Sequence, residues 1–322
     1  MSFITNAVSN DTTQIAINGQ TFTNEHKVPF ELAVFAGYHS TLYSGNPPRE
    51  GKLSTTTIIG PLRKALLAIM YPDTGTQDVT NLLASSKGTA MHTGLTNALQ
   101  AHNSGYICEQ RMEREINGWK ISGEFDVFTP DKQIKDLKFV SNYNIKKLIE
   151  DRDKLQPEWT LDEMYANVPT YFKYVAQLSI YRLLLDDPEV QPYGSILFSL
   201  NNGSDMGKYT IDQEVTFPLF PKEAIEEFLH NRVQVVKDHL AAGTLPLCTD
   251  SERGYSPAEY KLERYYPKSN STRTVPGSKF TNEAEFRNFV RTKGRPGDNE
   301  VIKEATYALC NYCKYSSVCN QE

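Results

Sequence analysis

The sequence has few cysteines, and it has no hydrophobic run that could cross a membrane. None of its apolar stretches approaches the roughly 20 residues that a transmembrane helix needs. Cysteine accounts for only five of the 322 residues. This odd number, together with a polar N-terminal segment (Met1–Asp11) that lacks a signal-peptide pattern, argues against a secreted protein held by disulfides. We therefore expect a cytoplasmic protein without a membrane partner.

The chain also lacks internal repeats, low-complexity tracts and an excess of positive charge. The first two absences exclude a repeat architecture. Lysine and arginine number 34 against 39 aspartates and glutamates, which gives a net charge of −5. Such a chain does not coat nucleic acid with its whole surface, although it can carry a local basic track. The G-x-x-x-x-G-K-[ST] motif is missing as well, so the chain is not a helicase of the P-loop type.

Three of the five cysteines crowd into ten residues near the end of the chain. Cys310, Cys313 and Cys319 form a C-x2-C-x5-C array, and Cys248 lies 62 residues before it. Four thiolates can hold zinc or an iron–sulfur cluster. Closing the long loop costs about 3–4 kcal/mol, whereas a structural metal site contributes about 10 kcal/mol or more. The spacing leaves zinc, an iron–sulfur cluster and unrelated thiols open.

Hydrophobic periodicity predicts a chain that mixes helices with strands. The dipeptide Asn117-Gly118 between two alternating segments indicates a two-residue hairpin. The predicted helices cover residues 61–70, 77–102 with a break near Gly88, 143–152, 159–165, 169–186, 221–242 and 281–292. The predicted strands cover residues 106–116, 119–128, 133–140, 193–201 and 207–216, with weaker strand signals at 14–23.

These elements predict an α/β protein with a mixed central sheet flanked by helices. We expect three parts along the chain. Residues 1–53 form an N-terminal extension, residues 54–243 the core, and residues 244–322 an irregular region that contains the terminal cysteines.

The strand at 133–140 combines charged and apolar residues on one face. Asp136 and Lys138 point the same way as Ile134 and Val140, because alternate residues of a strand share a face. On the neighbouring strand Asp126 lies on the face opposite the apolar side chains. If the hairpin pairs, the two aspartates converge within reach of one hard cation such as Mg²⁺ or Mn²⁺. The alternative is a cross-strand salt bridge on a solvated sheet face.

Two helices add polar residues that are out of character with their apolar surroundings. His92 shares a helix face with Leu95 and is either a hydrogen-bonded core residue or a metal ligand. As a ligand it would need a second acceptor to fix its other ring nitrogen. Gln177 and Tyr181 lie one turn apart in a largely apolar helix. Gln177 could orient Lys138, contact a phosphate, or bond a neighbouring loop.

Taken together, these segments resemble the RecB-like branch of the PD-(D/E)XK nuclease superfamily. That branch is marked by G-T-x-x-H, G-x-x-D, D-x-K and Q-x-x-x-Y motifs in this order. The chain has them at Gly88–His92, Gly123–Asp126, Asp136–Lys138 and Gln177–Tyr181. The resemblance covers about residues 54–190 and implies a restriction-endonuclease-like core.

The resemblance implies metal-dependent hydrolysis of phosphodiester bonds in DNA, by an exonuclease. It assigns Mg²⁺ or Mn²⁺ to His92, Asp126, Asp136 and the backbone carbonyl of Leu137. Lys138 would position the attacking water and offset charge in the transition state. Gln177 and Tyr181 would support Lys138 or the substrate. Supporting roles, or simple exposure on a strand, remain open for Glu113, Glu115 and Glu124.

Members of this branch with the same terminal cysteine array hold a four-iron cluster and use one remote cysteine. The AddB subunit and the CRISPR-associated adaptation exonucleases are of this kind. Their remote cysteine usually precedes the histidine motif, whereas here Cys108 follows His92 and no cysteine comes earlier. We therefore expect a 4Fe-4S cluster on Cys248 and the terminal array (Cys310, Cys313 and Cys319), with Cys108 as the less favoured ligand and zinc as the alternative metal.

The expected partner is DNA, as a single strand or as ends, in recombination, repair or phage replication. A phage-encoded protein would act in the host cytoplasm. Because the chain has no helicase motif, a helicase or a recombinase would have to open a duplex. Backbone contacts are predicted for Arg287, Arg291, Lys293 and Arg295, and a single-strand track for Lys261, Arg264 and Lys268 with Tyr260, Tyr265 and Tyr266.

Two alternatives to an exonuclease remain open from the sequence. One is a non-catalytic nucleic-acid-binding module with a structural four-cysteine zinc site. The other is a structure-specific endonuclease. An ordinary solvated surface is the alternative for the basic residues.

Overall fold

The structure is a computed structural model in which the chain divides into two compact units. The first unit comprises Met1–Leu247 with Ser317–Glu322, and the second comprises Cys248–Ser316. The segment Met1–Asp11 and the first part of the strand predicted at 207–216 lie outside the described residues. The structure describes residues 14–18, 20–24, 28–43, 48–72, 77–102, 105–200, 212–311 and 313–321.

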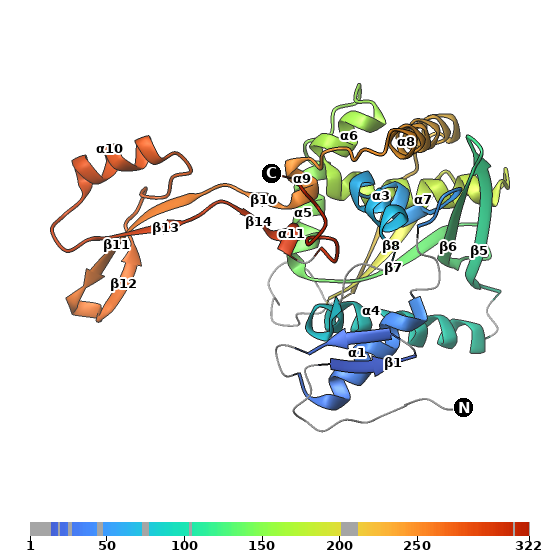
Figure 1. The fold of residues 1–322 in the computed structure, drawn as a ribbon, viewed down its shortest axis with the longest axis horizontal. Helices are drawn as coiled ribbons and strands as arrows, with labels where there is room; N and C mark the ends of the chain where they lie inside the picture. Colours follow the sequence, from blue (N-terminus) through green and yellow to red (C-terminus); the bar gives the residue numbers. More distant parts are fainter. Residues whose placement is uncertain are drawn as a thin grey trace. The chain divides into compact units, whose positions relative to one another are not determined.

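A six-stranded mixed sheet forms the centre of the first unit (Figure 1). Its strand order is β3-β6-β7-β8-β9, with β5 paired to β6. The β3–β6 and β7–β8 pairs are parallel and the others are antiparallel. Helices pack against this sheet, which confirms the predicted α/β architecture. The strands are β3 (Lys52–Ser54), β5 (Ile107–Ile116), β6 (Trp119–Phe128), β7 (Ile134–Val140), β8 (Tyr193–Leu200) and β9 (Asp212–Pro218).

The β5–β6 hairpin turns at Asn117 and Gly118, as the sequence predicts. Both residues have positive φ angles, 49° and 74°, which is the conformation of the tight turn that suits a twisted hairpin. Phe125 and Val127 on β6 are buried, whereas Glu124 and Asp126, which alternate with them, are only partly covered. The predicted alternation along β6 is confirmed.

The sheet opens between β3 and β7. On the side of β6 away from β5, β3 pairs with residues 120–122 and β7 pairs only with Val127 and Phe128. Between these two pairings, residues 123–126 have no strand beside them on that side within the described part of the chain. The backbone of β6 therefore faces an opening, and Asp126 lies at its edge.

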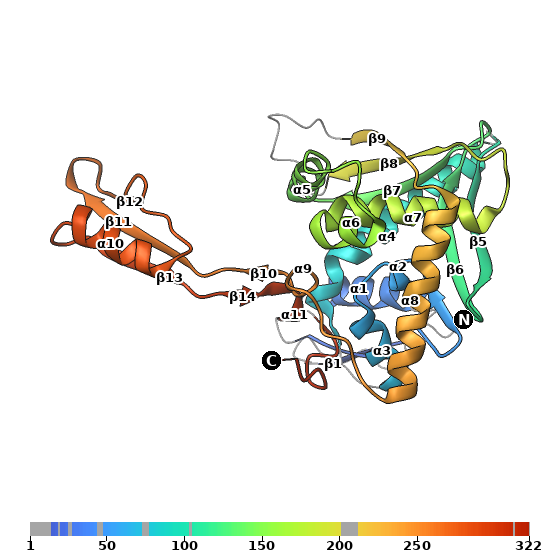
Figure 2. The ribbon, with the colours of Figure 1, turned by 90° about the horizontal axis from the view of Figure 1, so that it is seen from above.

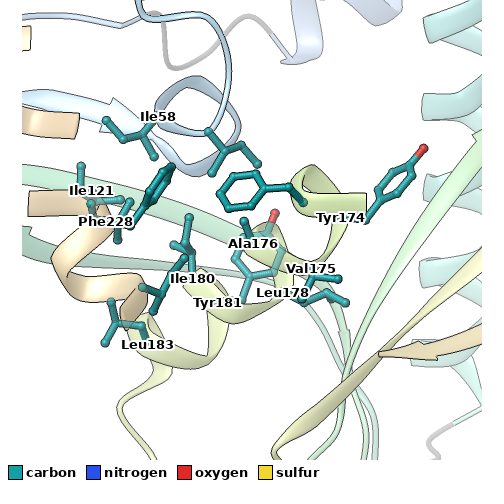
Figure 3. Close-up of a cluster of buried hydrophobic side chains, with 14 of the residues drawn as sticks. Ile58, Ile121, Tyr174, Val175, Ala176, Leu178, Ile180, Tyr181, Leu183 and Phe228 are labelled. Atoms are coloured by element: carbon teal, nitrogen blue, oxygen red, sulfur yellow. The ribbon is translucent and has the colours of Figure 1, made fainter. Parts of the chain in front are cut away.

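The helix α7 (Pro169–Leu185) is the centre of the hydrophobic core. Figure 3 shows its apolar side chains against Ile121 of β6 and Phe228 of α8. Figure 2 shows α8 running beside α7 and α3. Gly243, with a φ of 63°, ends α8 as predicted. The other helices of this layer are α2 (Thr55–Ile58), α3 (Leu62–Met70), α5 (Asn142–Arg152), α6 (Leu161–Asn167) and α8 (Lys222–Ala242).

A buried carboxylate fixes the start of α7. The residue before the helix, Val168, has no side chain that can cap it. Instead Oδ2 of Asp151, from α5, accepts hydrogen bonds from the backbone N–H groups of Thr170 (2.8 Å) and Tyr171 (3.3 Å). A negative charge is favourable at a helix N-terminus, so this contact sets where α7 lies on the sheet.

The helix α4 (Val79–Ala101) is continuous, so the break predicted near Gly88 is wrong. A Cβ atom at Gly88 would lie 3.4 Å from Cβ of Phe139, so the glycine allows α4 to approach β7 closely. The N-terminal elements pack against another side of α4. They are β1 (Gln14–Ile17), β2 (Gln20–Thr23) and α1 (Phe30–Tyr43). Their shared core contains Ile17, Phe22, Ala33, Ala36, Val79 and Leu82.

The second unit is more regular than the sequence suggests. Its helix α10 (Glu283–Lys293) was expected, but the three-stranded antiparallel sheet beside it was not. In β11 polar residues occupy both faces, so the period of two is hidden. The strands are β11 (Glu259–Tyr266), β12 (Ser271–Thr274) and β13 (Asn299–Lys303), and the shorter elements are α9 (Asp250–Arg253), β10 (Tyr255–Ser256), β14 (Thr306–Tyr307) and α11 (Ala308–Asn311).

Among the described residues, no helix is both long enough and apolar enough to pass through a membrane.

Candidate active site

A pocket of about 780 Å³ lies at the opening of the sheet. The turn from β3 into α2, the helices α4 and α7, and the strands β5, β6 and β7 all contribute to its walls. The residues of the four sequence motifs meet here, although they come from segments far apart in the chain. The predicted site residues that line the pocket are His92, Asp126, Asp136, Leu137, Lys138, Gln177 and Tyr181.

Asp126 bridges α4 and β7 through its two carboxylate oxygens. Oδ1 lies 2.9 Å from Nε2 of His92, and Oδ2 accepts a hydrogen bond of 2.6 Å from the backbone N–H of Leu137. Burial alone would raise the pKa of Asp126, but the hydrogen bond from His92 and the charge of Lys138 outweigh it and lower the pKa. Asp126 is therefore an ionised carboxylate at neutral pH.

Asp136 is buried, with 1% of its surface exposed. Its Oδ1 accepts a hydrogen bond of 3.0 Å from Nε2 of Gln177, and its Oδ2 lies 2.6 Å from Nζ of Lys138. Burial raises the pKa of Asp136 to about 7, and the nearby charge of Asp126 adds to this rise, whereas Lys138 opposes it. The two aspartates thus have different affinities for a proton, because their surroundings differ.

Lys138 is a charged ammonium group beside both carboxylates. Burial would lower its pKa, but the charges of Asp136 and Asp126 raise it above the ordinary value. Its side chain is 25% exposed, so the ammonium group reaches both Asp136 and the pocket.

Gln177 contacts Asp136, which differs from the contacts considered from the sequence. Its Nε2 donates to Oδ1 of Asp136 and to the hydroxyl oxygen of Tyr181, the latter at 2.7 Å. Burial raises the pKa of Tyr181 well above its ordinary value, so its phenol stays protonated. The Q-x-x-x-Y pair therefore fixes the buried aspartate from the side of α7.

Gly123 is required where β6, α2 and α7 come together. A Cβ atom at this position would lie 2.8 Å from Oγ1 of Thr55, 2.8 Å from Cε1 of Tyr181 and 2.9 Å from Cδ1 of Leu184. These distances are shorter than van der Waals contact, so a side chain at position 123 would force the side chains of Thr55, Tyr181 and Leu184, or the helices that carry them, to shift. The glycine of the G-x-x-D motif thus allows the pocket wall to close.

We expect Gly123→Ala to lower the free energy of unfolding by about 1–3 kcal/mol, because extra atoms in a packed site force backbone shifts. Urea denaturation measures this change. Gly94→Ala on α4 is the matched control, since a Cβ there meets no atom within 4 Å and the same substitution in a helix is neutral or stabilising. Equal stability of Gly123→Ala and the unchanged protein would contradict the packing argument.

The donors in the pocket suit a hard divalent ion. Mg²⁺ and Mn²⁺ prefer oxygen ligands such as the two carboxylates, and an imidazole nitrogen is a less usual ligand for them. Oδ2 of Asp136 and Nδ1 of His92 are buried and have no aligned hydrogen bond to the described residues. Nevertheless, no three His, Cys, Asp or Glu side chains in the described part of the chain are arranged to hold a metal ion together. In this structure His92 and Asp126 face each other instead.

Glu109 is a pocket residue that sequence reasoning missed. It lies on β5, and its Oε1 is 3.2 Å from Nδ1 of His92. The sequence contains enough information to find it. The Asn117-Gly118 turn fixes the register of the hairpin, and counting back along both strands from the turn places Glu109 opposite Asp126. Of the glutamates considered instead, Glu113 pairs with Lys52 outside the pocket.

The remaining two glutamates have different positions. Glu124 lines the pocket and pairs with Arg111 at 2.9 Å, whereas Glu115 is an exposed strand residue. A supporting role is thus compatible with the position of Glu124.

Of the four predicted cluster ligands, Cys319 belongs to the first unit, and Cys248, Cys310 and Cys313 belong to the second. In the second unit a tight turn joins Cys310 and Cys313, whose backbone N–H donates to the Cys310 carbonyl at 3.1 Å. In the first unit the buried Arg63 donates from Nε to Sγ of Cys319 at 3.1 Å. Cys108, the less favoured ligand, lies on β5 and is half-buried. The absence of a three-residue metal group noted above includes these cysteines.

Several predicted DNA contacts are engaged within the second unit. Arg287 pairs with Glu283 and Glu300, and Arg264 makes two hydrogen bonds of 2.7 Å to Asp298. Other cations point to solvent: Arg291, Lys293 and Arg295 are exposed. Lys268, from the predicted single-strand track, is exposed as well.

Comparisons with known proteins find similar folds only. No family model matches the sequence, and no curated protein matches it. Among solved structures, the crystal structure of SSO0001 is 17% identical with a TM-score of 0.42, over 62% of this chain and 84% of that one. The alkaline exonuclease LHK-Exo from Laribacter hongkongensis is 14% identical with a TM-score of 0.35, over 60% and 89%. A phage-related exonuclease from Haemophilus somnus 129PT is 16% identical with a TM-score of 0.36, over 60% and 96%.

Proposed function

We propose that this chain is a metal-dependent DNA exonuclease that hydrolyses phosphodiester bonds in single strands or at DNA ends. One observation carries the proposal: Asp126, Asp136 and Lys138 meet in one pocket where the sheet opens. A solvated cross-strand ion pair would not need a buried carboxylate, nor a glutamine that holds it from another helix. Two of the structurally similar proteins are described as exonucleases, which agrees with the proposal but adds no weight at these TM-scores.

The residues have distinct roles in this proposal. His92, Asp126, Asp136 and the Leu137 carbonyl would hold Mg²⁺ or Mn²⁺. The bound ion would lower the pKa of a water molecule and polarise the scissile phosphate.

Lys138 and Gln177 have roles that do not require them to bind the metal ion. The ammonium group of Lys138 would orient the attacking water and stabilise negative charge that develops on the phosphate. Gln177 keeps Asp136 in place through the hydrogen bond to Oδ1.

Digestion of end-labelled DNA tests the proposal. Linear single-stranded DNA should be degraded to short products in Mn²⁺ and should stay intact in EDTA. A circular single strand should resist, because an exonuclease needs an end. Lys138→Ala protein purified in parallel controls for contaminating nucleases.

Each outcome separates one alternative. Cutting of the circle would indicate an endonuclease. No degradation of any substrate by the unchanged protein, together with tight DNA binding, would favour the non-catalytic binding module. Acceleration of duplex digestion by an added helicase would support the expected partner.

We also propose that Cys248, Cys310, Cys313 and Cys319 bind a 4Fe-4S cluster. The tight turn between Cys310 and Cys313 gives a spacing suited to two ligands of one metal centre. The buried Arg63 donates a hydrogen bond to the sulfur of Cys319 and so holds that sulfur in place. A cluster here would have a structural role.

Protein purified without oxygen is expected to be brown and to contain about four irons per chain. Cys248→Ala should lose the iron and become less stable, whereas Cys108→Ala, the matched control, should keep both. Metal analysis and visible absorbance measure the first result, and thermal unfolding measures the second. A colourless protein with one zinc per chain would replace the cluster with the zinc alternative.

The exposed cations of the second unit complete the proposal. We assign contacts with the DNA backbone to Arg291, Lys293 and Arg295, which lie at the end of α10 and just beyond it. Substitution of each of these residues by alanine should lower the slope of log affinity against log salt concentration by about one.

A further inference from the structure

His92 lies between two carboxylates that face each other across the β5–β6 hairpin. Its Nε2 is 2.9 Å from Oδ1 of Asp126, and its Nδ1 is 3.2 Å from Oε1 of Glu109. The hairpin register places Glu109 opposite Asp126, between the pairs on either side of them. Like charges directly opposite each other in a sheet are unfavourable. A protonated imidazole between them offsets the repulsion that the hairpin would otherwise carry.

The backbone of Glu109 is in an unusual conformation. Its φ angle is 55°, in the left-handed region, although the strand continues on both sides. A residue other than glycine pays on the order of 1 kcal/mol or more for this conformation, and such positions often occur at functional sites. The strain persists only if neighbouring contacts hold the residue in place.

Thr96 provides such a contact. It is fully buried on α4, one turn after His92, and its hydroxyl oxygen lies 3.2 Å from Oε1 of Glu109 and 3.1 Å from the backbone carbonyl oxygen of His92, two of the acceptors for its single hydrogen. The same oxygen atom thus faces both Thr96 and Nδ1 of His92. The helix that carries the histidine also fixes the carboxylate beside it.

We propose that Glu109 is a positioning residue that accepts a hydrogen bond from the Nδ1–H of His92 and leaves Nε2 free to bind a divalent metal ion. This inference rests on the proposed function, in which His92 is a metal ligand. In a neutral imidazole one nitrogen donates and the other accepts, and the partner of the first decides which is which. Metal-bound histidines commonly give their other N–H to a carboxylate for this reason.

The position of the proton follows from the two contacts. Nε2 faces Asp126, a candidate ligand of the same ion, so a metal bound between them must replace the proton at Nε2. The remaining proton then lies on Nδ1, and Glu109 is the acceptor beside it. The Nδ1 contact is short but not aligned as a hydrogen bond in this structure, and such contacts can tighten when the site is filled.

Mn²⁺ binding, measured by titration calorimetry, tests the role of Glu109. Glu109→Ala should weaken binding about 10- to 100-fold. Glu109→Gln should stay within a few-fold of the unchanged protein, because its amide oxygen still accepts a hydrogen bond from the Nδ1–H of His92. Glu115→Ala is the matched control on the same strand face, where the side chain is exposed and outside the pocket, and it should not change the affinity. Unchanged affinity in Glu109→Ala would overturn the inference.

Nitrogen NMR of His92 in Mg²⁺ gives a readout that a merely structural role would not move. At a Mg²⁺ concentration that fills the unchanged protein but not the weakened variant, the unchanged protein and Glu109→Gln should carry the proton on Nδ1, and Glu109→Ala should show a mixture of the two forms. If Glu109→Ala does not fold, Thr96→Val replaces it, with a smaller loss of metal affinity in the same direction.

The failures of the two proposals are distinguishable. In one outcome the unchanged protein cleaves DNA and binds Mn²⁺, while Glu109→Ala has equal affinity and the same proton position. That result would overturn the role of Glu109 and leave the proposed function intact. An unchanged protein that neither binds Mn²⁺ nor cleaves DNA removes both proposals.

Discussion

Lys138→Ala is expected to slow DNA cleavage about 100- to 1,000-fold at saturating Mn²⁺, because it removes the cation that faces developing charge in the transition state. The ammonium group lies 2.6 Å from Asp136 and reaches the pocket. Single-turnover digestion of labelled single-stranded DNA measures the rate of the chemical step without product release.

The variant should also change metal binding, and pH separates the two effects. Lys138 opposes the rise in the pKa of Asp136, so its removal should raise that pKa further and weaken Mn²⁺ binding at neutral pH. At pH 9 the carboxylate is ionised again, and metal binding should recover while the slow cleavage persists.

Lys135→Ala is the control for this experiment. Lys135 lies on the same strand, pairs with Glu214 and is not part of the pocket wall. Its loss should leave the cleavage rate within about twofold. A Lys138→Ala protein that retains more than a tenth of the rate would contradict the assigned role.

Asp136→Asn is expected to abolish metal-dependent cleavage and yet to stabilise the protein in EDTA at pH 8 by about 1–3 kcal/mol, given roughly 1.4 kcal/mol per pKa unit and partial relaxation of the site. The reason is that the carboxylate is ionised in a buried place beside another carboxylate. Asparagine keeps an oxygen that can accept from Gln177 but carries no charge. Functional sites often hold groups that cost stability in this way.

The sign of the pH dependence follows from the raised pKa. Burial raises the pKa of Asp136 from 3.8 to about 7, so between these values the folded protein binds more protons than the unfolded chain. The free energy of unfolding therefore falls as pH rises through this window. The contribution of Asp136 is fully present below pH 3.8 and is lost above about pH 7. The amide of the Asp136→Asn variant does not titrate, so the difference between the two proteins should grow from pH 5 to pH 8.

Urea denaturation at pH 5 and pH 8 measures this difference. Saturating Mg²⁺ should reduce or reverse it, because only the folded protein with Asp136 gains metal binding. Lower stability of Asp136→Asn than of the unchanged protein at pH 8 in EDTA would show that the ionised carboxylate is not the costly group.

The sequence predicted those parts of the pocket for which a local pattern of residue types has one structural meaning. The Asn117-Gly118 turn and the period of two defined the hairpin, and the D-x-K spacing placed Asp136 and Lys138 on one face. Gln177 was conspicuous as a polar residue in an apolar helix. Each of these arguments uses residues within one element or one turn, where backbone geometry alone fixes the neighbours.

Contacts between distant segments could not be predicted in the same way. Arg63 and Cys319 are 256 positions apart, and nothing local to either residue points to the other. The strands β11 to β13 carry polar residues on both faces, so their alternation is hidden. The helix α1 was missed because its apolar residues are spread around the helix without a clear period.

The carboxylate of Asp126 has a second task besides facing the pocket. It accepts a hydrogen bond from the backbone N–H of Leu137 at the point where β6 and β7 separate. This side-chain contact connects the two strands where they have no backbone pairing. An inactive protein meant to trap substrate should therefore keep this residue. A substitution of Asp126 would remove this connection between the strands, and a loss of cleavage activity could not then be distinguished from a change in the structure of the site.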